Sequence, residues 1–367
     1  MTPPRIIFIG GFLGAGKTTL MFEAAKKLAA QGKCVGLVTN DQAPELVDTT
    51  LLRTTGSRVA EVSGSCFCCN FPGMAGAIQS LAADADIILA EPVGSCADLS
   101  ATILQPLKDG KAGDFSVAPL TVLADPQRLA GILDGNSAGL HDSSAYIFRK
   151  QLEEADFILI SKSDTLGEFA LAALAARLAA AFPKARLFAA SARTGAGIDT
   201  WLDAVMTQPN AGAAVLADVD YDVYAEGEAV LGWLNATYEL ASANAVDWRD
   251  FAENLLDALS RELDAQRVAV GHVKLAVSCG ALLVTANLTG VRGTLEAHGD
   301  AVSGTSATLT LNARVQTTPA RLGALVREKM DGACGASIAA NLVAWRCLRP
   351  GYPRPTHRYQ TVVKNMD

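Results

Sequence analysis

A glycine-rich segment, GFLGAGKT, lies between an apolar run and a stretch of helix-forming residues. It covers residues 11–18, follows the apolar residues 6–9 and leads into residues 19–25. Glycine lets the backbone bend around an anion without an obstructing Cβ, so successive N–H groups can point at phosphate oxygens. A helix that begins at Lys17 adds the positive end of its dipole. The segment therefore predicts a phosphate-binding loop and a protein that binds a nucleoside triphosphate.

The motif also assigns roles to single side chains. Lys17 would reach the β- and γ-phosphates as a point charge, and the hydroxyl of Thr18 would bind Mg²⁺. An ordinary turn between a strand and a helix is the alternative, which the complete motif in its required context disfavours. The residues predicted to hold the phosphates are Gly14, Ala15, Gly16, Lys17, Thr18 and Thr19.

Three cysteines lie within four residues, in the sequence CFCC at residues 66–69. Thiolates are soft ligands that suit Zn²⁺ or another thiophilic transition metal. Three ligands leave one coordination position open, which favours a site that loads and releases a metal, or a site that another residue completes. A redox-active pair is the alternative, but a disulfide between neighbouring cysteines needs unusual geometry. The candidate ligands are Cys66, Cys68 and Cys69.

Two carboxylates and one glycine follow apolar runs on either side of this cluster. Glu91 comes after residues 87–90, where its carboxylate could orient a Mg²⁺-bound water or the attacking water. Asp41 is the matching candidate on the other side of the metal, and the backbone amide of Gly94 could contact the γ-phosphate. We therefore expect Lys17, Glu91 and Asp41 to be the catalytic group. Carboxylates in solvated loops are the alternative reading of Asp41 and Glu91.

Cys96 lies two residues after Gly94. It is a candidate fourth metal ligand or transfer ligand, which would connect the metal to the loop that contacts the γ-phosphate. A buried apolar thiol is the alternative, because cysteine is among the most buried residue types.

Two further segments predict the base of the nucleotide. Asp164, which follows Lys162 at the end of an apolar run, could accept two hydrogen bonds from the N1–H and exocyclic amine of guanine, a pair that adenine does not offer. Ser191 and Ala192 follow the next run and could present a backbone amide to the guanine O6. The alternative role of Asp164 is the N-cap of the alanine-rich helix that follows it.

The elements that position these residues alternate along the first two hundred residues. Mostly apolar runs separated by helical stretches predict a parallel sheet covered on both faces. Ligands bind such sheets at the carboxyl ends of the strands, where the candidate residues lie. The predicted strands are residues 6–10, 34–39, 87–91, 120–124, 157–161 and 187–191.

The rest of the chain predicts a small α+β domain after a hinge at residues 208–212. We expect a strand near residues 225–238, a helix over 248–266, strands over 268–277, 282–288 and 307–315, and a helix over 320–330. The predicted organisation is a nucleotide-binding domain at 1–207, the α+β domain at 218–348 and a proline-rich, extended tail at 349–367. His272 and His357 could contact a cargo or a metal, although a surface histidine is the simpler interpretation.

Composition excludes several classes of partner. The 367 residues carry a net charge of −7, which argues against a nucleic-acid partner. No apolar stretch is long enough to cross a bilayer, and a strand so close to the N-terminus leaves no room for a signal peptide. We therefore expect a cytoplasmic protein without a membrane partner, whose eight cysteines are thiols.

Taken together, the motifs resemble those of the CobW/HypB/UreG family of metal-handling P-loop GTPases. The resemblance covers residues 5–205 and only loosely the second domain, and Ser161 stands where the family usually has asparagine. The segments that carry it, in order, are GFLGAGKTT, GSCFCC, EPVG, QLEEADFILISKSD and SARTGAGIDTW.

The resemblance implies a fold and an activity. The fold would be an α/β P-loop NTPase domain with a mostly parallel sheet, joined to a smaller α+β domain. The activity would be Mg²⁺-dependent hydrolysis of GTP, slow because no arginine is identifiable as a finger. Hydrolysis would be coupled to metal binding at the CxCC loop and to delivery of the metal, or of a metal cofactor such as cobalamin, to a client metalloprotein or cobalamin-dependent protein. The resemblance also suggests a homodimer closed over the nucleotide.

Two other functions fit the same residues. One is a regulatory switch that responds to GTP and zinc without transferring the metal, and the other is a small-molecule kinase. The cysteine cluster lies between Asp41 and Glu91 in the sequence, so in each GTP-dependent case we expect metal occupancy and nucleotide state to influence one another.

Overall fold

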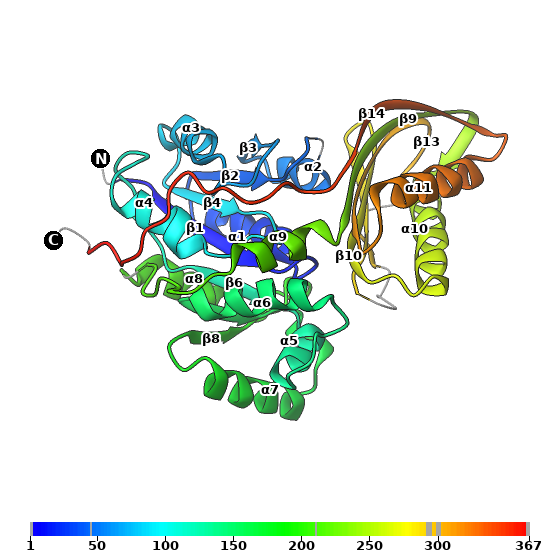
Figure 1. Ribbon diagram of the computed structural model, residues 1–367. Helices are drawn as coiled ribbons and strands as arrows, with labels where there is room; N and C mark the ends of the chain where they lie inside the picture. Colours follow the sequence, from blue (N-terminus) through cyan, green and yellow to red (C-terminus); the bar gives the residue numbers. More distant parts are fainter. Residues whose placement is uncertain (1–2, 45, 210, 291–295, 299–301, 365–367) are drawn as a thin grey trace. The chain divides into compact units, whose positions relative to one another are not determined.

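The computed structural model describes residues 3–44, 46–209, 211–290, 296–298 and 302–364. The chain divides into two compact units (Figure 1). The first unit comprises residues 1–42, 52–227 and 352–367, and the second comprises residues 43–51 and 228–351. This division differs from the expected boundaries in three respects. The main part of the second unit begins at Glu228, and residues 43–51 also belong to that unit. Most of the tail, which was expected as a separate part, belongs to the first unit.

A parallel sheet forms the centre of the first unit, in the order β3-β2-β4-β1-β6-β7-β8, with β5 also paired to β1. The apolar runs of the sequence become its inner strands, which are buried because helices cover the sheet (Figure 1). The strands are β1 (Arg5–Gly11), β2 (Val35–Asn40), β3 (Arg58–Val62), β4 (Ile87–Glu91), β5 (Ser116–Val117), β6 (Thr121–Ala124), β7 (Phe157–Ile160) and β8 (Arg186–Ala189).

The six predicted strands of this sheet are confirmed, and β3 and β5 are additional. β3 is an edge strand whose residues are mostly half-exposed, so it lacks the continuous apolar signal of the inner strands. The connecting helices are α1 (Lys17–Ala30), α2 (Val47–Arg53), α3 (Phe71–Ala82), α4 (Gln105–Lys108), α5 (Pro126–Leu133), α6 (Asp142–Glu154), α7 (Glu168–Ala181), α8 (Ile198–Thr207) and α9 (Tyr221–Ala229), with a π-helix at Ser100–Leu104 before α4.

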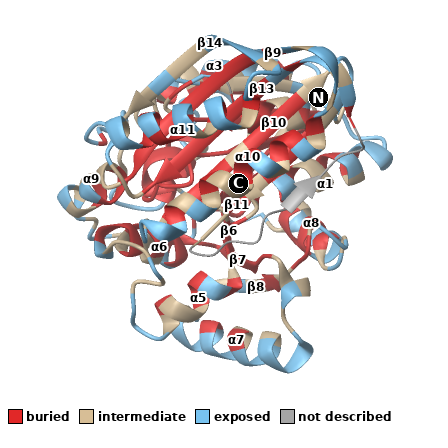
Figure 2. Cartoon of the chain, turned by 90° about the vertical axis from the view of Figure 1, so that its right-hand side faces the viewer, coloured by how far each residue is buried: buried red, intermediate tan, exposed pale blue. Residues whose placement is uncertain are grey.

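The second unit is an antiparallel sheet in the order β12-β11-β10-β13-β9-β14, with two helices packed on one face. Figure 2 shows its strands mostly buried and the outer sides of α10 and α11 exposed. The elements are β9 (Gly232–Asp247), α10 (Trp248–Ala265), β10 (Val270–Cys279), β11 (Leu282–Leu288), β12 (Glu296–His298), β13 (Ser303–Val315), α11 (Pro319–Cys334) and β14 (Ile338–Leu348). The α+β class predicted for this part of the chain is confirmed.

One predicted strand in this half is wrong in its first part. Residues 225–238 were expected to form a single strand, but α9 continues to Ala229 before β9 begins at Gly232. The side chain of Asp220 accepts hydrogen bonds from the backbone N–H groups of Asp222 (2.9 Å) and Val223 (3.1 Å), so it caps the start of α9. β14 was not predicted, because it is an edge strand in which no residue is buried.

The face of this sheet opposite α10 and α11 is polar, and it binds residues 43–51. Neighbouring cross-strand residues Asn235, Lys274 and Asn312 lie on this face. Asn235 donates to the carbonyls of Ala43 (3.2 Å) and Pro44 (3.0 Å), and Asn312 accepts a 2.8 Å hydrogen bond from the backbone of Val47. Lys274 pairs with Asp48 at 2.6 Å. These contacts attach residues 43–51 to the second unit.

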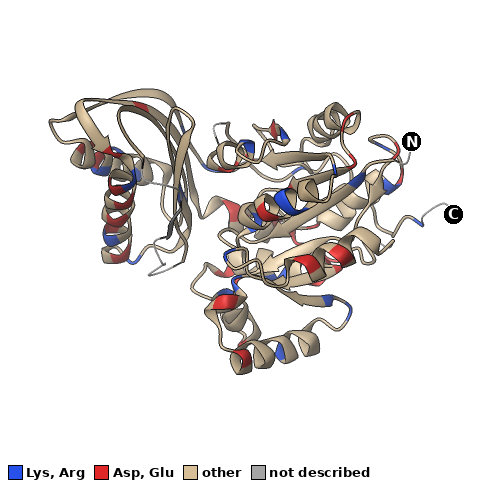
Figure 3. Cartoon of the chain, turned by 180° about the vertical axis from the view of Figure 1, so that it is seen from behind, with Lys and Arg blue, Asp and Glu red and all other residues tan. Residues whose placement is uncertain are grey.

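Charges of both signs are interspersed along the exposed helices, as Figure 3 shows for α10. Arg249 pairs with Glu253 at 3.0 Å, and Arg261 pairs with Asp257 at 2.6 Å, both at i,i+4 spacing. Such surface pairs contribute little to stability, about 0.3–0.5 kcal/mol each. Among the helices described, none combines the length and apolar character needed to cross a membrane.

Candidate nucleotide and metal site

The glycine-rich loop lies between β1 and α1, as predicted. Gly14 and Gly16 have φ values of 77° and 88°, which only glycine adopts without strain, and Gly16 is the residue from which α1 starts. A Cβ on Gly11 would lie 2.4 Å from the carbonyl oxygen of Leu123 on β6. The backbone path of the loop therefore depends on glycine both for its dihedral angles and for its closeness to the sheet.

Three buried polar side chains meet beside this loop. Lys17, Thr18 and Glu91 are each 6% exposed. The hydroxyl of Thr18 donates to the Oε2 atom of Glu91 at 2.8 Å, and the Nζ of Lys17 lies 3.8 Å from Oε1 of the same carboxylate. Hydroxyl and carboxylate oxygens are hard ligands that suit Mg²⁺, so these residues fit the predicted ion.

Asp41 follows directly on β2, at the same edge of the sheet as Glu91 on the neighbouring β4. Its backbone N–H donates to the carbonyl of Val62 at 3.1 Å, and its side chain is largely buried. A role of Asp41 beside the metal stays a prediction.

The turn after β4 approaches the phosphate loop at Gly94. A Cβ at this position would lie 2.8 Å from the Nζ of Lys17 and 3.1 Å from the backbone nitrogen of Leu13. The buried side chain of Gln151 on α6 donates to the carbonyls of Gly94 (3.0 Å) and Cys96 (2.7 Å). The side-chain amide of Gln151 therefore fixes both ends of the segment from Gly94, which lies beside Lys17, to Cys96.

Cys66, Cys68 and Cys96 form the thiol cluster. Their sulfur atoms all lie within 4.8 Å of one another, and the Cys66 and Cys68 sulfurs are 3.1 Å apart. A tetrahedral zinc ion with Zn–S bonds of about 2.3 Å holds its sulfurs roughly 3.8 Å apart, so the cluster needs little rearrangement to bind one. The side chains of the three residues are 3%, 2% and 1% exposed.

Cys69 has a different position from the other predicted ligands. Its sulfur lies 3.8 Å from that of Cys68 but is not among the three that lie within 4.8 Å of one another. The structure thus brings Cys96 into the cluster, where the sequence offered it only as an additional candidate. All eight cysteines lie in the described part of the chain, and none of them forms a disulfide there.

Asn40 at the end of β2 holds the backbone of the cysteine loop. Its amide nitrogen donates to the carbonyls of Val62 (2.9 Å) and Ser65 (2.8 Å), and its amide oxygen accepts from the backbone N–H of Phe67 (2.8 Å). The ring of Phe67 packs edge-on against Phe8 of β1, with 6.4 Å between centroids. No role of Asn40 was predicted from the sequence, although its position at a strand end was a usable signal.

Mutual hydrogen bonding changes the acidity of these thiols. The hydrogen bond from Cys68, with smaller contributions from Cys69 and Cys96, holds the pKa of Cys66 well below its usual value. The hydrogen bond with Cys66 raises the pKa of Cys68. A separate hydrogen bond between Cys69 and Cys66 raises the pKa of Cys69 to about 11. One thiolate therefore forms readily, whereas further deprotonation requires a bound cation.

The predicted base-reading segments lie together at the ends of β7 and β8. Asp164 accepts a 2.8 Å hydrogen bond from Nε of Arg193, and hydrogen bonds from Ser191 and then Arg193 lower the pKa of its carboxyl group. Lys162, which has a positive φ of 49°, pairs with Asp125 at 3.1 Å. The alternative role of Asp164 as a helix cap is wrong, because Gly167 precedes the first residue of α7. Ala192 directly follows Ser191 in this segment.

Ser161 and Arg128 add contacts that the sequence did not specify. The hydroxyl of Ser161 donates to the carbonyl of Ala124 at 3.3 Å, so it braces the base-reading segment against β6. Arg128 on α5 is buried and donates to the carbonyl of Leu13, with its guanidinium 5.5 Å from the ring centroid of Phe12. An arginine soon after a strand end is the signal that could have drawn attention to it.

The two candidate histidines, His272 and His357, lie outside the thiol cluster. His272 is on β10 of the second unit and is buried, so its interpretation as a surface residue is wrong. The ring of His357 packs edge-on against Phe71 at the start of α3, with 4.9 Å between centroids.

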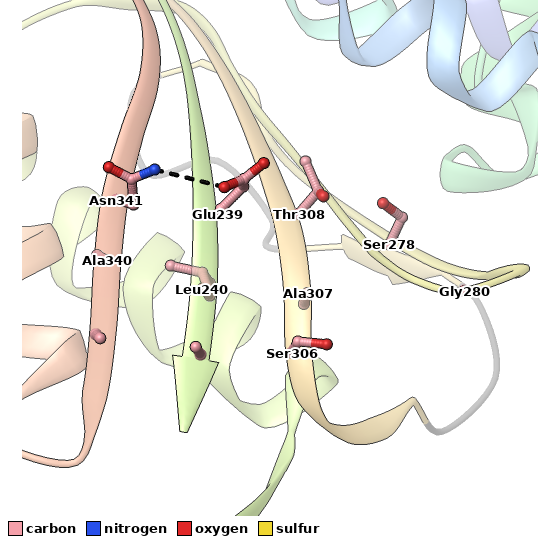
Figure 4. A pocket seen from close by; sticks show the side chains of 11 residues that line it. Glu239, Leu240, Ser278, Gly280, Ser306, Ala307, Thr308, Ala340 and Asn341 are labelled. Carbon is pink, nitrogen blue, oxygen red and sulfur yellow. Dashed lines mark hydrogen bonds between the residues drawn. The ribbon is translucent and has the colours of Figure 1, made fainter. Parts of the chain in front are cut away.

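The second unit has a separate hollow of about 650 Å³ on the polar face of its sheet. Figure 4 shows Glu239, Ser278, Thr308 and Asn341 on neighbouring strands there, with a 3.4 Å hydrogen bond from Asn341 to Glu239. Its lining is mostly small and neutral, and it contains a single carboxylate. The residues predicted to bind phosphate and metal all lie in the first unit.

The solved structures that align with this chain include a hydrogenase maturation factor and a GTPase. HypB from Archaeoglobus fulgidus is 18% identical with a TM-score of 0.41, over 55% of this chain and 87% of its own. The Zn(II)-bound YjiA GTPase from E. coli is 15% identical with a TM-score of 0.33, over 91% of this chain and 99% of its own. At such scores these alignments carry no argument about this chain.

Curated relatives match a shorter part of the sequence. The zinc chaperone CobW of Pseudomonas aeruginosa is 26% identical over 208 residues, covering 49% of this chain and 54% of its own. The zinc chaperone YeiR of Escherichia coli is 33% identical over 169 residues, covering 44% and 47%. The chain thus spans about half the length of the curated relatives it matches.

The sequence also matches a family description, the CobW/HypB/UreG nucleotide-binding domain, over residues 5–189. That range makes up half of the chain and includes the phosphate loop, both cysteine segments and Asp164. The chain belongs to the CobW/HypB/UreG family.

Proposed function

We propose that this protein is a GTP-hydrolysing metallochaperone. It binds zinc or a similar thiophilic metal at Cys66, Cys68 and Cys96, and it couples GTP binding and hydrolysis to delivery of that metal to a client metalloprotein. Membership of the CobW/HypB/UreG family and the similarity to two zinc chaperones support this function. A more specific version of this function is delivery of a metal cofactor to a cobalamin-dependent client. A site built from three thiols favours a metal ion over such a cofactor.

The chain's own residues divide the nucleotide chemistry among them. The loop amides and Lys17 hold the phosphates, while Thr18 and Glu91 would hold Mg²⁺, which neutralises charge that develops on the phosphoryl oxygens. Asp41 is the proposed partner of Glu91 in orienting the attacking water. Asp164 reads guanine once Arg193 has moved off its carboxylate.

The observation that carries the coupling is the short segment from Gly94 to Cys96. Gly94 lies against the amine of Lys17, and Cys96 is in the thiol cluster. Gln151 fixes the carbonyls of both residues, so a shift at the phosphate end is transmitted to the sulfur end. By linkage, a nucleotide that changes metal affinity must itself bind differently when the metal is present.

A regulatory switch without metal transfer is the second candidate. The near-complete burial of the three thiols favours it, because a buried ion is retained more easily than it is handed on. Transfer of the metal separates the two functions. A chaperone releases its zinc to an acceptor in step with GTP hydrolysis, whereas a switch keeps it through the cycle.

The first experiment measures metal content and GTP turnover of the full chain. Wild type should hold about one zinc ion per chain, and its turnover rate should change severalfold when zinc is removed. Cys66→Ser should bind no zinc, and its turnover rate should not respond to zinc. Cys34 is exposed and lies outside the cluster, so Cys34→Ser should keep both the zinc and the response. Equal turnover rates with and without bound zinc in wild type would overturn the coupling.

The second experiment addresses the connection between the sites. Gln151→Leu should still bind zinc and hydrolyse GTP, because the amide of Gln151 donates to the backbone carbonyls of Gly94 and Cys96 rather than to a sulfur. In this variant zinc should no longer change the turnover rate. Zinc release to a chelating dye during single-turnover GTP hydrolysis then separates the chaperone from the switch. Release that follows hydrolysis supports delivery, and zinc retained through the cycle supports the switch.

A further inference from the structure

Residues 352–363 run in an extended path over the cysteine loop, and we call this segment the strap (Figure 1). The backbone N–H of Arg354 donates to the sulfur of Cys69 at 3.1 Å. The backbone N–H of Thr356 donates to the carbonyl of Cys68 at 2.8 Å, and its hydroxyl donates to the carbonyl of Cys69 at 3.2 Å. Both the sulfur and the backbone of the loop are therefore bound by the strap.

The strap is fastened just beyond the loop. The Nε of Arg358 donates to the Oδ2 of Asp98 at 2.6 Å, and the hydroxyl of Tyr221 donates to the same oxygen at 2.8 Å. The side chain of Asp98 is fully buried, so the guanidinium neutralises a charge that water does not reach. Because Asp98 lies two residues after Cys96, the strap joins the two stretches that supply the thiol cluster.

The strap makes further hydrogen bonds after Arg358. The backbone N–H of Tyr359 donates to the carbonyl of Ala101 at 3.0 Å, and that of Val363 donates to the side chain of Gln105 at 2.8 Å. Most of these bonds use the backbone of an extended, proline-containing segment without helix or strand. Such a segment can detach locally without unfolding the sheet beneath it.

We propose that the strap is a removable cover of the thiol site and that it withholds Cys69 from the metal. The inference rests on the proposed metal binding at Cys66, Cys68 and Cys96. While the strap is in place, the sulfur of Cys69 is engaged by the amide of Arg354 and the three cluster thiols are at most 3% exposed. When the strap leaves, Cys69 becomes available as an additional ligand and the ion gains a path to a partner.

The test uses a matched pair of full-chain variants at one position. Arg354→Pro removes the N–H that binds the sulfur of Cys69, whereas Arg354→Ala removes the exposed side chain and keeps that N–H. Arg358→Ala removes the fastening on Asp98. If Arg358→Ala does not fold, the pair at position 354 decides the question alone.

Two rates are measured for each variant, with circular dichroism to verify folding. The first is the rate at which an aromatic disulfide reagent labels the thiols of the reduced, metal-free protein, and the second is the rate of zinc release to a chelating dye. Arg354→Pro and Arg358→Ala should raise both rates about tenfold or more, because opening of the strap becomes more frequent. Arg354→Ala should stay within about twofold of wild type, and the affinity for GTP should stay unchanged in all three.

The possible failures are distinguishable. If wild type binds no zinc, the proposed function fails, and the labelling rates still report whether the strap covers the thiols. If wild type binds zinc but all variants label and release at the wild-type rate, the cover is overturned and the proposed metal site stands. A rise in Arg354→Ala equal to that in Arg354→Pro would overturn the role assigned to the amide.

Discussion

The phosphate loop and the thiol site belong to the same unit of the chain but are assembled in different ways. The phosphate loop is one continuous stretch between β1 and α1, shaped by glycines at positive φ. The thiol site takes its sulfurs from two stretches about thirty residues apart in the sequence, and a third stretch, residues 352–363, is hydrogen-bonded to Cys69 beside it. A local motif fixes the first site, whereas the second exists only in the folded chain.

This difference has consequences for robustness. Side-chain substitutions outside the phosphate loop should leave its geometry intact, because the loop's own backbone carries its anion contacts. The thiol site depends on distant supports such as Asn40 and Asp98. Substitutions far from the sulfurs should therefore alter metal binding more readily than they alter nucleotide binding.

The largest effect should come from Lys17→Ala. Lys17 is the proposed phosphate-binding cation, so GTP turnover should fall about 10²- to 10³-fold while zinc content is unchanged. Lys26→Ala, on the exposed side of the same helix, is the control and should keep wild-type turnover. Loss of zinc together with turnover in Lys17→Ala would mean that the two sites are not separable.

Cys96→Ser and Cys69→Ser distinguish the two candidate fourth sulfurs. Cys96 is within the three-sulfur set, so its substitution should weaken zinc affinity by about 100-fold or more, whereas Cys69→Ser should have a smaller effect. A competition titration with a zinc-chelating dye measures both. A larger loss in Cys69→Ser would show that the ion selects the continuous CxCC stretch, as the sequence alone first indicates.

Glu154 makes the segment that carries Cys96 sensitive to pH. Burial, followed by the charge of Asp98, raises the pKa of Glu154 to about 8, and its Oε2 accepts a 2.8 Å hydrogen bond from the backbone of Ser100. Between the unfolded value near 4.5 and about 8 the folded chain binds a proton that the unfolded chain has lost. The free energy of unfolding should therefore fall as pH rises, by up to about 1.4 kcal/mol per pH unit.

Denaturation at several pH values between 5 and 8 measures this slope. Glu154→Gln mimics the protonated carboxyl group and should flatten it, whereas Glu153→Gln, an exposed neighbour, should not. Equal slopes in all three proteins would show that Glu154 is not protonated in the folded state.

The smallest effect should come from a methyl group added where the two sites meet. Gly94→Ala would place a Cβ 2.8 Å from the Nζ of Lys17, and displacement of the ammonium should weaken nucleotide binding about tenfold. Gly76→Ala, on α3 with open space around it, is the matched control and should stabilise the fold by about 0.5–1 kcal/mol. If Gly94→Ala binds GTP with wild-type affinity, Gly94 does not link the two sites.

The sequence predicted the parts of the fold whose signals are local. The inner strands were recognised from continuous apolar runs, and the phosphate loop from glycine spacing between a strand and a helix. The edge strands β3 and β14 escaped prediction because few of their residues are buried. The strand expected at residues 225–238 failed because the cap at Asp220 was not recognised.

The candidate site follows the same pattern. Lys17, Glu91 and Cys96 lie where strand ends were expected to place chemistry, but the supports at Asn40, Arg128 and Gln151 have no motif around them. Their roles arise from contacts between residues far apart in the sequence. Residues 43–51 belong to the second unit and the strap belongs to the first. Both assignments likewise depend on packing that no local sequence pattern encodes.

The contact between Cys69 and Arg354 joins positions 285 residues apart in the chain. A ribosome makes the sulfurs, the phosphate loop and the entire second unit before it makes the amide that binds Cys69. During synthesis the three cluster thiols therefore exist for a period with nothing from residues 352–363 over them.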